Sequence, residues 1–187
     1  MKKKALPSLF GFPVSDDDQD RISAAVRTQH FKKNEIIFAQ GEVCQQIYVI
    51  RSGLVKLSYL TLQGKEAIKS FISEDELFGS LYSQLTGGGS TFSAVALEDL
   101  DVEVLDYSLL QKLIERSPDL QKMLMHFFQQ LALKKEIREY EFLCLSAKQR
   151  YDKLCTESPA LVKRIKQRDL ALYLGITPIA LSRLKHR

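Results

Sequence analysis

Short apolar runs alternate with turn residues from about Phe31 to Tyr107. Several runs alternate apolar with polar positions, which is the period of a half-buried strand. Strands are predicted over residues 35–38, 47–50, 54–60, 67–72, 93–97 and 102–106. Gly41, Gly53, Gly64 and Gly79 punctuate this region at intervals of 11 to 15 residues. The spacing predicts an all-β sandwich, jelly roll or barrel and leaves no room for the crossover helices of a parallel βαβ fold.

The pattern changes to a helical one after Tyr107, where a short helix is predicted over 108–116. Ser117-Pro118-Asp119 then has the signature of a helix start: an N-cap serine, a proline at the first position and an acid in the first turn. No glycine or proline follows before about Leu143. The segment therefore predicts a helix of roughly 26 residues, about 39 Å long.

An apolar stripe follows one side of this predicted long helix. It consists of Leu120, Met123, Leu124, Phe127, Phe128 and Leu131, and it continues more weakly through Ile137, Tyr140 and Cys144. The helix is longer than a small domain needs for its own core, so a second copy of the same helix is its natural partner. We therefore predict a dimer interface at Leu120, Leu124, Phe127 and Leu131. Packing entirely against the β-domain of the same chain is the alternative.

Residues 167–184 have the pattern of a helix-turn-helix, after a further predicted helix over 147–155 and a turn at Ser158-Pro159. Gly175 stands at the turn, where a positive φ is expected. Thr177 can cap the second helix, and Pro178 suits its first position. The apolar positions that let the two helices pack are Leu170, Leu174, Ile176, Leu181 and Leu184, with the small Ala171 where the helices approach.

Composition indicates a globular protein of a reducing compartment. Hydrophobic residues make up 45% and charged residues 27% of the 187 residues, which is ordinary globular usage. No apolar stretch approaches the roughly 18–20 residues that cross a bilayer, and prolines and glycines interrupt the segment behind the basic N-terminus, which argues against a signal peptide. Cys44, Cys144 and Cys155 are odd in number and far apart, so we expect a cytoplasmic protein with no disulfide framework.

Charge is divided unevenly along the chain. Residues 146–187 hold ten basic and three acidic side chains, a net charge of +7, whereas the first 145 residues have a net charge of −3. A basic tail on a mildly acidic body suggests a polyanionic partner, with a solvated basic surface as the alternative. Together with the helix-turn-helix pattern, this charge predicts binding to double-stranded DNA.

In this geometry the second helix, about 178–186, enters the major groove with its early exposed residues facing base edges. Arg183 could make a bidentate contact to guanine or could contact phosphate alone, and the sequence leaves both open. Ile179, Ala180 and Ser182 are the other outward candidates. Thr177, Lys185 and Arg187 are expected to contact the DNA backbone, and Lys163, Arg164 and Lys166 either do so or are solvated. The predicted DNA-binding set is Gln167, Thr177, Pro178, Ile179, Ser182, Arg183 and Lys185.

Over roughly residues 20–187 the chain resembles the Crp/Fnr (cyclic-AMP receptor/fumarate-nitrate regulator) family of bacterial transcription factors. The blocks that carry the resemblance are Ile37-Phe38-Ala39-Gln40-Gly41-Glu42, Ile47-Tyr48-Val49-Ile50, Ser52-Gly53-Leu54-Val55, Gly64-Lys65-Glu66 and Leu77-Phe78-Gly79. The resemblance implies an α+β fold with an N-terminal double-stranded β-helix (a jelly-roll, cyclic-nucleotide-binding-like domain) over 1–116. It also implies a long dimerisation helix over 117–144 and a C-terminal helix-turn-helix domain over 145–187. A homodimer on a near-palindromic operator is expected, with RNA polymerase as a candidate partner.

The sequence departs from the family's cyclic-nucleotide binders at the ligand pocket. Those proteins follow Phe-Gly with Glu and later carry Arg-Ser or Arg-Thr, whereas this chain has Ser80 after Phe78-Gly79 and Ser90-Thr91 at the later pair. A desolvated phosphate without its cation is costly, so a degenerate pocket is expected at Phe78, Gly79, Ser80, Leu81, Ser90 and Thr91, with little or no affinity for cyclic AMP. Residues 87–89, three glycines, either offer N–H groups to an anion or form a flexible loop.

Other effectors and cofactors find little support in the sequence. Lys134-Lys135 could attract an anion or be a solvated pair. An iron–sulfur cluster would need several N-terminal cysteines, and a haem would depend on His30 or Cys44 alone, so no cofactor is predicted and the effector is unknown. The recognition helix departs too: where the cyclic-AMP binder carries Arg-Glu, this chain has Pro178-Ile179, so its operator should differ.

Enzyme classes fit the sequence poorly. A metal-dependent cupin needs clustered histidines and a glutamate, but His30, His126 and His186 are scattered. No serine or cysteine lies in a nucleophile motif, so we predict a protein that is not an enzyme. The alternative to DNA binding is a cyclic-nucleotide- or small-anion-sensing module that acts through protein–protein contacts.

Overall fold

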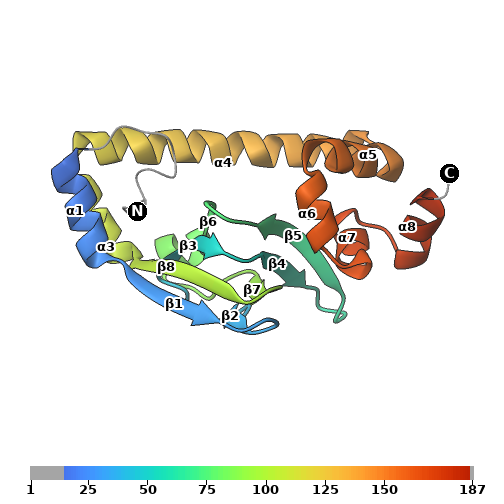
Figure 1. Cartoon of the computed structure of the whole chain (residues 1–187), viewed down its shortest axis with the longest axis horizontal. Coiled ribbons are helices and arrows are strands. Elements are labelled where there is room, and N and C mark those ends of the chain that lie inside the picture. The colour runs from blue at the N-terminus through green and yellow to red at the C-terminus, as the bar shows by residue number, and fades with distance from the viewer. Residues whose placement is uncertain (1–14, 186–187) are drawn as a thin grey trace. The chain divides into compact units, whose positions relative to one another are not determined.

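The structure is a computed structural model that describes residues 15–185, and Figure 1 shows the order of its elements. The described residues form eight strands: β1 (Arg27–Phe31), β2 (Ile36–Phe38), β3 (Gln46–Ser52), β4 (Val55–Leu60), β5 (Glu66–Ile72), β6 (Leu77–Phe78), β7 (Ser93–Ala96) and β8 (Leu100–Asp106). They also form eight helices: α1 (Asp16–Ala25), α2 (Leu81–Thr86), α3 (Tyr107–Arg116), α4 (Pro118–Cys144), α5 (Ala147–Glu157), α6 (Pro159–Arg164), α7 (Gln167–Tyr173) and α8 (Pro178–Lys185).

The strands make an antiparallel β-sandwich of two four-stranded sheets, ordered β1-β8-β3-β6 and β2-β7-β4-β5. The run Ile47–Ile50 on β3 is apolar throughout because both of its faces are covered. Tyr48 and Ile50 belong to the core inside the sandwich, whereas Ile47 and Val49 belong to a second core on the outer face. Alternate residues of a strand point to opposite faces, so a strand between two cores loses its polar positions.

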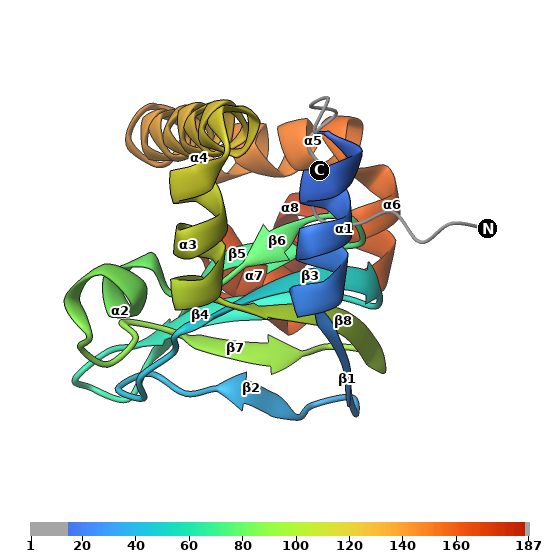
Figure 2. The same ribbon diagram turned by 90° about the vertical axis from the view of Figure 1, so that its left-hand side faces the viewer.

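The second core is formed where α1, α3 and the start of α4 pack on the outer face of the sandwich; Figure 2 shows α1 and α3 side by side above the strands. Leu120 and Met123 bring α4 into this core. Ser117 caps α4, since its Oγ accepts the N–H of Leu120 at 3.2 Å and its hydroxyl donates to the carboxylate of Asp18. The helix start predicted at Ser117-Pro118 is therefore confirmed.

The predicted α+β fold is confirmed, and all six predicted strands are present with their ends shifted by one or two residues. The prediction missed β1, β6 and the helices α1, α2 and α6. β6 has two residues and α2 and α6 have six each, too few for a periodic pattern. The predicted turn at Ser158-Pro159 is a junction between helices, because Ser158 ends α5 and Pro159 begins α6.

The chain divides into two compact units. Of the described residues, one unit contains 15–57 together with Phe71–Gln130, and the other contains Ser58–Ser70 together with 131–185. This division follows packing, whereas the predicted boundaries at 116/117 and 144/145 follow secondary structure. Within residues 15–185, no helix combines the length and the apolar character that a membrane span requires.

Candidate nucleic-acid interface

Helices α7 and α8 form a helix-turn-helix. Leu170, Leu174 and Leu181 are at most 1% exposed and pack the two helices together. Gly175 follows α7 with φ +69°, in the left-handed region that favours glycine. Thr177 caps α8 by accepting the N–H of Ala180 on its Oγ1 at 3.2 Å. The turn chemistry predicted from the sequence is therefore confirmed.

The outer face of α8 presents several of the predicted contact residues to solvent. Ile179 is 67% exposed, and Ser182, Arg183 and Lys185 are exposed as well. Because Ile179, Ser182 and Arg183 are three and four residues apart, they share one face of the helix. Gln167, Thr177 and Pro178 are also exposed at the starts of α7 and α8.

One predicted contact residue of this helix is less exposed than expected, and two other predicted residues lie outside the described part of the chain. Ala180 was predicted to face outward, but it is half-buried beside the core residue Leu181, so it is a poorer candidate for a base contact than its neighbours. His186, the predicted last residue of the recognition helix, and Arg187, a predicted backbone contact, lie outside the described residues.

Two arginines from α4 and α5 stack with aromatic rings beside the turn. The Arg138 guanidinium lies 4.5 Å from the centre of the Phe142 ring and 3.8 Å from that of Tyr173. The Arg150 guanidinium lies 4.7 Å from the Phe142 ring. Cations and rings attract each other in this arrangement. We call Arg138, Phe142, Arg150 and Tyr173 the arginine–aromatic ladder.

The ladder also holds the end of α7 by hydrogen bonds. Nη2 of Arg138 donates to the carbonyl of Tyr173 at 2.6 Å, and Nη2 of Arg150 donates to the carbonyl of Leu174 at 2.9 Å. The carboxyl end of a helix carries partial negative charge, so both cations are placed favourably. Burial lowers the pKa of Arg138, although an arginine keeps its charge in proteins.

Gly175 brings the turn close to the ladder. A Cβ at this position would lie 3.0 Å from the Phe142 ring, so even an alanine would require the ring to move. The ladder thus joins the turn of the helix-turn-helix to the end of α4 and to α5. No local sequence pattern marks the ladder, because its partners are far apart along the chain.

The six residues of the predicted effector pocket are largely built into the sandwich. Phe78, Ser80 and Ser90 are buried, Gly79 and Leu81 are half-buried, and Thr91 is exposed. Oγ of Ser80 accepts the N–H of Ser83 as the cap of α2, and the hydroxyl of Ser90 donates to the carbonyl of Phe92 at 2.7 Å. Both serines therefore have structural partners at the positions where a nucleotide binder uses charged groups.

Aromatic rings fill the interior of the sandwich behind these serines. Tyr48 and Phe78 stack with their centres 4.9 Å apart, and Phe38 lies 5.6 Å from Phe92 and 6.2 Å from Tyr48. The glycine run has a packing role as well. A Cβ on Gly89 would collide with the carbonyl oxygen of Gly41, so glycine is needed where these two backbones meet.

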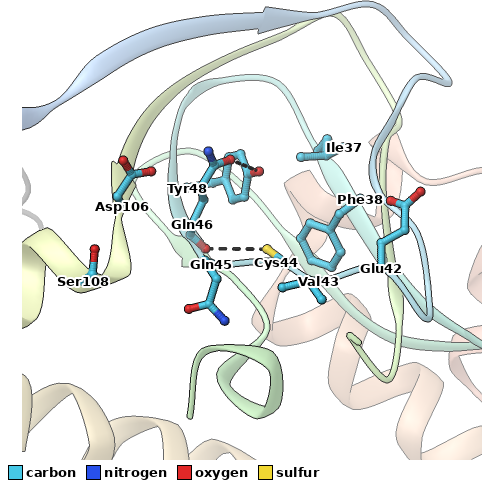
Figure 3. Close-up of a pocket in the computed structure, with 10 residues that line it drawn as sticks. All are labelled: Ile37, Phe38, Glu42, Val43, Cys44, Gln45, Gln46, Tyr48, Asp106 and Ser108. Atoms are coloured by element: carbon cyan, nitrogen blue, oxygen red, sulfur yellow. Dashed lines mark hydrogen bonds between the residues drawn. The ribbon is translucent and has the colours of Figure 1, made fainter. Parts of the chain in front are cut away.

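A cavity of about 480 Å³ opens beside this cluster (Figure 3). Among the described residues that line it, the charged ones are the carboxylates Glu42 and Asp106. Burial raises the pKa of the Cys44 thiol. Burial, together with the charge of the nearby Cys44, raises the pKa of Tyr48 to about 12. Both groups are therefore neutral near pH 7. None of the described lining residues is a cation that could pair with an anion, although Arg27 lies 3.9 Å from the Asp106 carboxylate and offsets part of its charge. The residues that line it are Ile37, Phe38, Glu42, Val43, Cys44, Gln45, Gln46, Tyr48, Asp106 and Ser108.

No cluster of three or more histidine, cysteine, aspartate or glutamate side chains suited to a metal ion occurs in the part of the chain that the structure describes.

Comparison with known proteins shows which proteins this chain is similar to. Residues 28–117 match the family described as the cyclic nucleotide-binding domain. The chain is 28% identical over 193 residues to the fumarate and nitrate reduction regulatory protein of Vibrio cholerae, covering 94% of this chain and 74% of that protein. It is 29% identical to the transcriptional activator protein Anr of Pseudomonas aeruginosa, covering 87% of this chain and 65% of that one, slightly less than two thirds. Together these matches support a transcriptional regulator of the Crp/Fnr type.

Solved structures share the fold. FixK2 from Bradyrhizobium japonicum superposes with a TM-score of 0.74 at 20% identity, covering 86% of this chain and 83% of FixK2. The catabolite activator protein of Thermus thermophilus gives a TM-score of 0.61 at 25% identity, covering 95% and 85%. Of the two curated relatives, one is named a regulatory protein and the other a transcriptional activator.

The predicted dimer interface on α4 is wrong at one residue. Leu120 is fully buried in the second core of its own chain, so it has no surface to offer a second copy. Leu124 and Phe127 are half-buried and line a small apolar cavity with Ile22 and Met123, and Leu131 is half-buried too. These three residues keep part of their surface for a partner.

A regular row of exposed apolar residues lies further along the helix. Leu133, Ile137 and Tyr140 are 49%, 42% and 58% exposed, and Cys144 is exposed as well. Their spacing of four, three and four residues is the a/d repeat of a coiled coil. We call Leu133, Ile137, Tyr140 and Cys144 the exposed seam.

Proposed function

We propose that this Crp/Fnr regulator binds a near-palindromic DNA operator as a homodimer, with α8 of each copy in the major groove. The observation that carries the proposal is the outer face of α8, where Ile179, Ser182 and Arg183 are exposed, whereas Leu181 on the inner face is fully buried. A guanidinium can contact guanine in a bidentate way, and a serine can serve as donor or acceptor. Lys185, Thr177 and Gln167 are suited to backbone contacts.

The homodimer is proposed to form along α4. The exposed seam supplies an a/d repeat in the second half of the helix, and Leu124, Phe127 and Leu131 add half-buried apolar surface before it. Two copies joined in parallel along this helix would present two recognition helices with two-fold symmetry. Their half-sites should then lie about one turn of DNA, roughly 34 Å, apart.

The effector is proposed not to be cyclic AMP. The positions of the charged nucleotide contacts hold Ser80 and Ser90, whose hydroxyls have partners in the chain, and the nearby cavity carries carboxylates. A cyclic phosphate there would be desolvated without a cation. Calorimetry with cyclic AMP should detect no binding at micromolar concentration, and a clear micromolar dissociation constant would contradict this part of the proposal. We further propose a cytoplasmic location, with RNA polymerase as a candidate partner.

Selection of bound sequences from random duplexes by the full chain tests the whole proposal, because it yields both the site and its symmetry. The expected result is an enriched inverted repeat. Arg183→Ala should weaken this site by about 1–3 kcal/mol and leave non-specific binding nearly intact if Arg183 reads a base. If it contacts phosphate alone, both affinities should fall together and the salt slope should shrink by about one. Lys122→Ala, which removes an exposed positive charge from the other unit, is the matched control.

Enrichment of no motif, with and without cell extract to supply an effector, would contradict DNA recognition. It would favour the alternative function, a sensing module for a cyclic nucleotide or small anion that acts through protein–protein contacts.

A further inference from the structure

Ile179 is a large apolar side chain left in solvent at the start of the recognition helix. It is 67% exposed, whereas Leu181, two residues on, is fully buried and provides the packing of α8 against α7. Ile179 is therefore not needed to fold the helix-turn-helix. It shares its face with Ser182 and Arg183, the two polar residues best placed to reach base edges.

We infer that Ile179 reads a thymine by packing against its C5 methyl group in the major groove; this inference rests on the operator binding proposed above. The thymine methyl is the apolar feature in the major-groove code, and apolar side chains are its usual partners. At any other base the isoleucine would cover a polar edge without replacing its hydrogen bonds to water, which is unfavourable. Ser182, Arg183 and Ile179 thus form a surface that can contact both polar and apolar groups of the bases.

The position of this thymine relative to the contact of Arg183 follows from helix geometry. Ile179 precedes Arg183 by four residues, about one turn or 5.4 Å along the helix axis. Successive bases of one strand are about 3.4 Å apart. The thymine should therefore lie within about two base pairs of the base pair that Arg183 contacts.

Replacing thymine by deoxyuridine tests the inference directly, because this change removes the methyl group and keeps every hydrogen-bonding group. Each thymine of the selected half-site is replaced in turn, and affinity is measured for the full-length wild type, Ile179→Ala and Ile179→Val. One thymine should matter: its replacement should weaken wild-type binding about three- to fivefold, as expected for one buried methyl group. Ile179→Ala should bind the thymine and uracil duplexes equally, and Ile179→Val should keep part of the difference.

The controls separate the possible failures. Ser182→Ala should retain the sensitivity to uracil, and circular dichroism with thermal unfolding should show that Ile179→Ala folds as the wild type does, since the side chain is exposed. A wild type that binds all uracil duplexes as well as the parent duplex would overturn the inference, as would equal sensitivity in wild type and Ile179→Ala. Both results leave operator binding intact. If the selection yields no site at all, the proposed function itself fails.

Discussion

The two halves of α4 belong to one uninterrupted helix, yet they differ in what covers their apolar side chains. In the first half, Leu120 and Met123 are buried in the second core of their own chain. In the second half, Leu133, Ile137 and Tyr140 remain 42–58% exposed in the single chain. The change occurs near Gln130, where the helix passes from one compact unit to the other.

This difference shows that an apolar stripe on a helix does not by itself identify a dimer interface. In the first half, the fold itself buries Leu120 and Met123, although Leu124 and Phe127 keep part of their surface exposed. In the second half, the fold leaves the exposed seam uncovered, and a regular a/d repeat of exposed residues is the pattern that a second helix covers in a coiled coil. Substitutions in the two halves should therefore have different consequences, one for folding and the other for association.

The largest effect is expected from Leu120→Asp. This change places a carboxylate in a closed apolar core, and burial of an unpaired charge is among the most destabilising substitutions known. The free energy of unfolding should fall by at least about 4 kcal/mol, measured by urea titration. Leu133→Asp, the same change in the second half, should leave the sandwich folded. Equal loss of folded sandwich in both variants would refute the contrast between the halves.

Ile137→Asp should act on association. Two carboxylates would meet across the seam of the proposed dimer, and the dimer dissociation constant should rise at least about 100-fold because buried charges there lack partners. Sedimentation velocity at micromolar concentration should then show a folded monomer. Lys135→Asp introduces the same carboxylate on the other side of the helix and should leave the dimer intact.

The double variant Phe127→Asp with Leu131→Asp tests the middle of α4, where the side chains contribute both to the fold of their own chain and to the proposed dimer. Both side chains are half-buried in their own chain, so the variant should lose stability as well as association. A wild type that is monomeric at micromolar concentration would contradict the dimer altogether.

Local signals in the sequence were sufficient for the strands, the long helix and the turn of the helix-turn-helix. Ser117-Pro118 and Gly175-Ile176-Thr177-Pro178 act through their nearest neighbours, so a cap or a positive φ can be predicted from a few residues. The exposed face of α8 followed from the same local geometry.

Features that depend on distant partners could not be predicted from one sequence. The stripe on α4 was found, but which of its residues the chain itself covers depends on α1 and α3, so Leu120 was wrongly assigned to a dimer interface. The arginine–aromatic ladder joins Arg138 to Tyr173, 35 residues away, and nothing local marks either residue. The role of the serines in the predicted pocket likewise depends on partners that only the fold brings near.

The arginine–aromatic ladder connects the second half of α4 to its surroundings by polar contacts, whereas the second core connects the first half by apolar ones. Arg150→Ala removes a charged hydrogen bond to the Leu174 carbonyl and a cation stacked on Phe142. The helix-turn-helix unit should lose about 2 kcal/mol of stability, and hydrogen exchange of the amides in 173–176 should speed up accordingly. Arg150→Lys should not restore protection, because an ammonium group lacks the planar fork that stacks and bridges. Full protection in either variant would contradict the role of the ladder.

The smallest effect concerns Lys69 on β5, which belongs to the same unit as the second half of α4. Burial, followed by the positive charges of Lys135 and Lys134, lowers the pKa of Lys69 to about 8 from its ordinary value of 10.5. Between these two values the unfolded chain binds a proton that the folded chain has released, so stability rises with pH in this window. The first half of α4 is stabilised by apolar contacts that do not titrate. The unit that contains Lys69 and the second half of α4 should instead become more stable as the pH rises through this window.

Urea unfolding of the wild type should therefore show that Lys69 increases the free energy of unfolding by about 1 kcal/mol between pH 7 and pH 9. Lys69→Met removes the titrating group and should reduce the pH dependence by that amount, while the titration of Cys44 and Tyr48 continues in both proteins and cancels in the comparison. Lys135→Ala removes a nearby positive charge, so it should raise the pKa of Lys69 in the folded protein and narrow the window from its lower end. An identical pH dependence in wild type and Lys69→Met would show that Lys69 keeps its ordinary pKa in the folded protein. In that case the second half of α4 would differ from the first in its exposed apolar seam but not in its electrostatics.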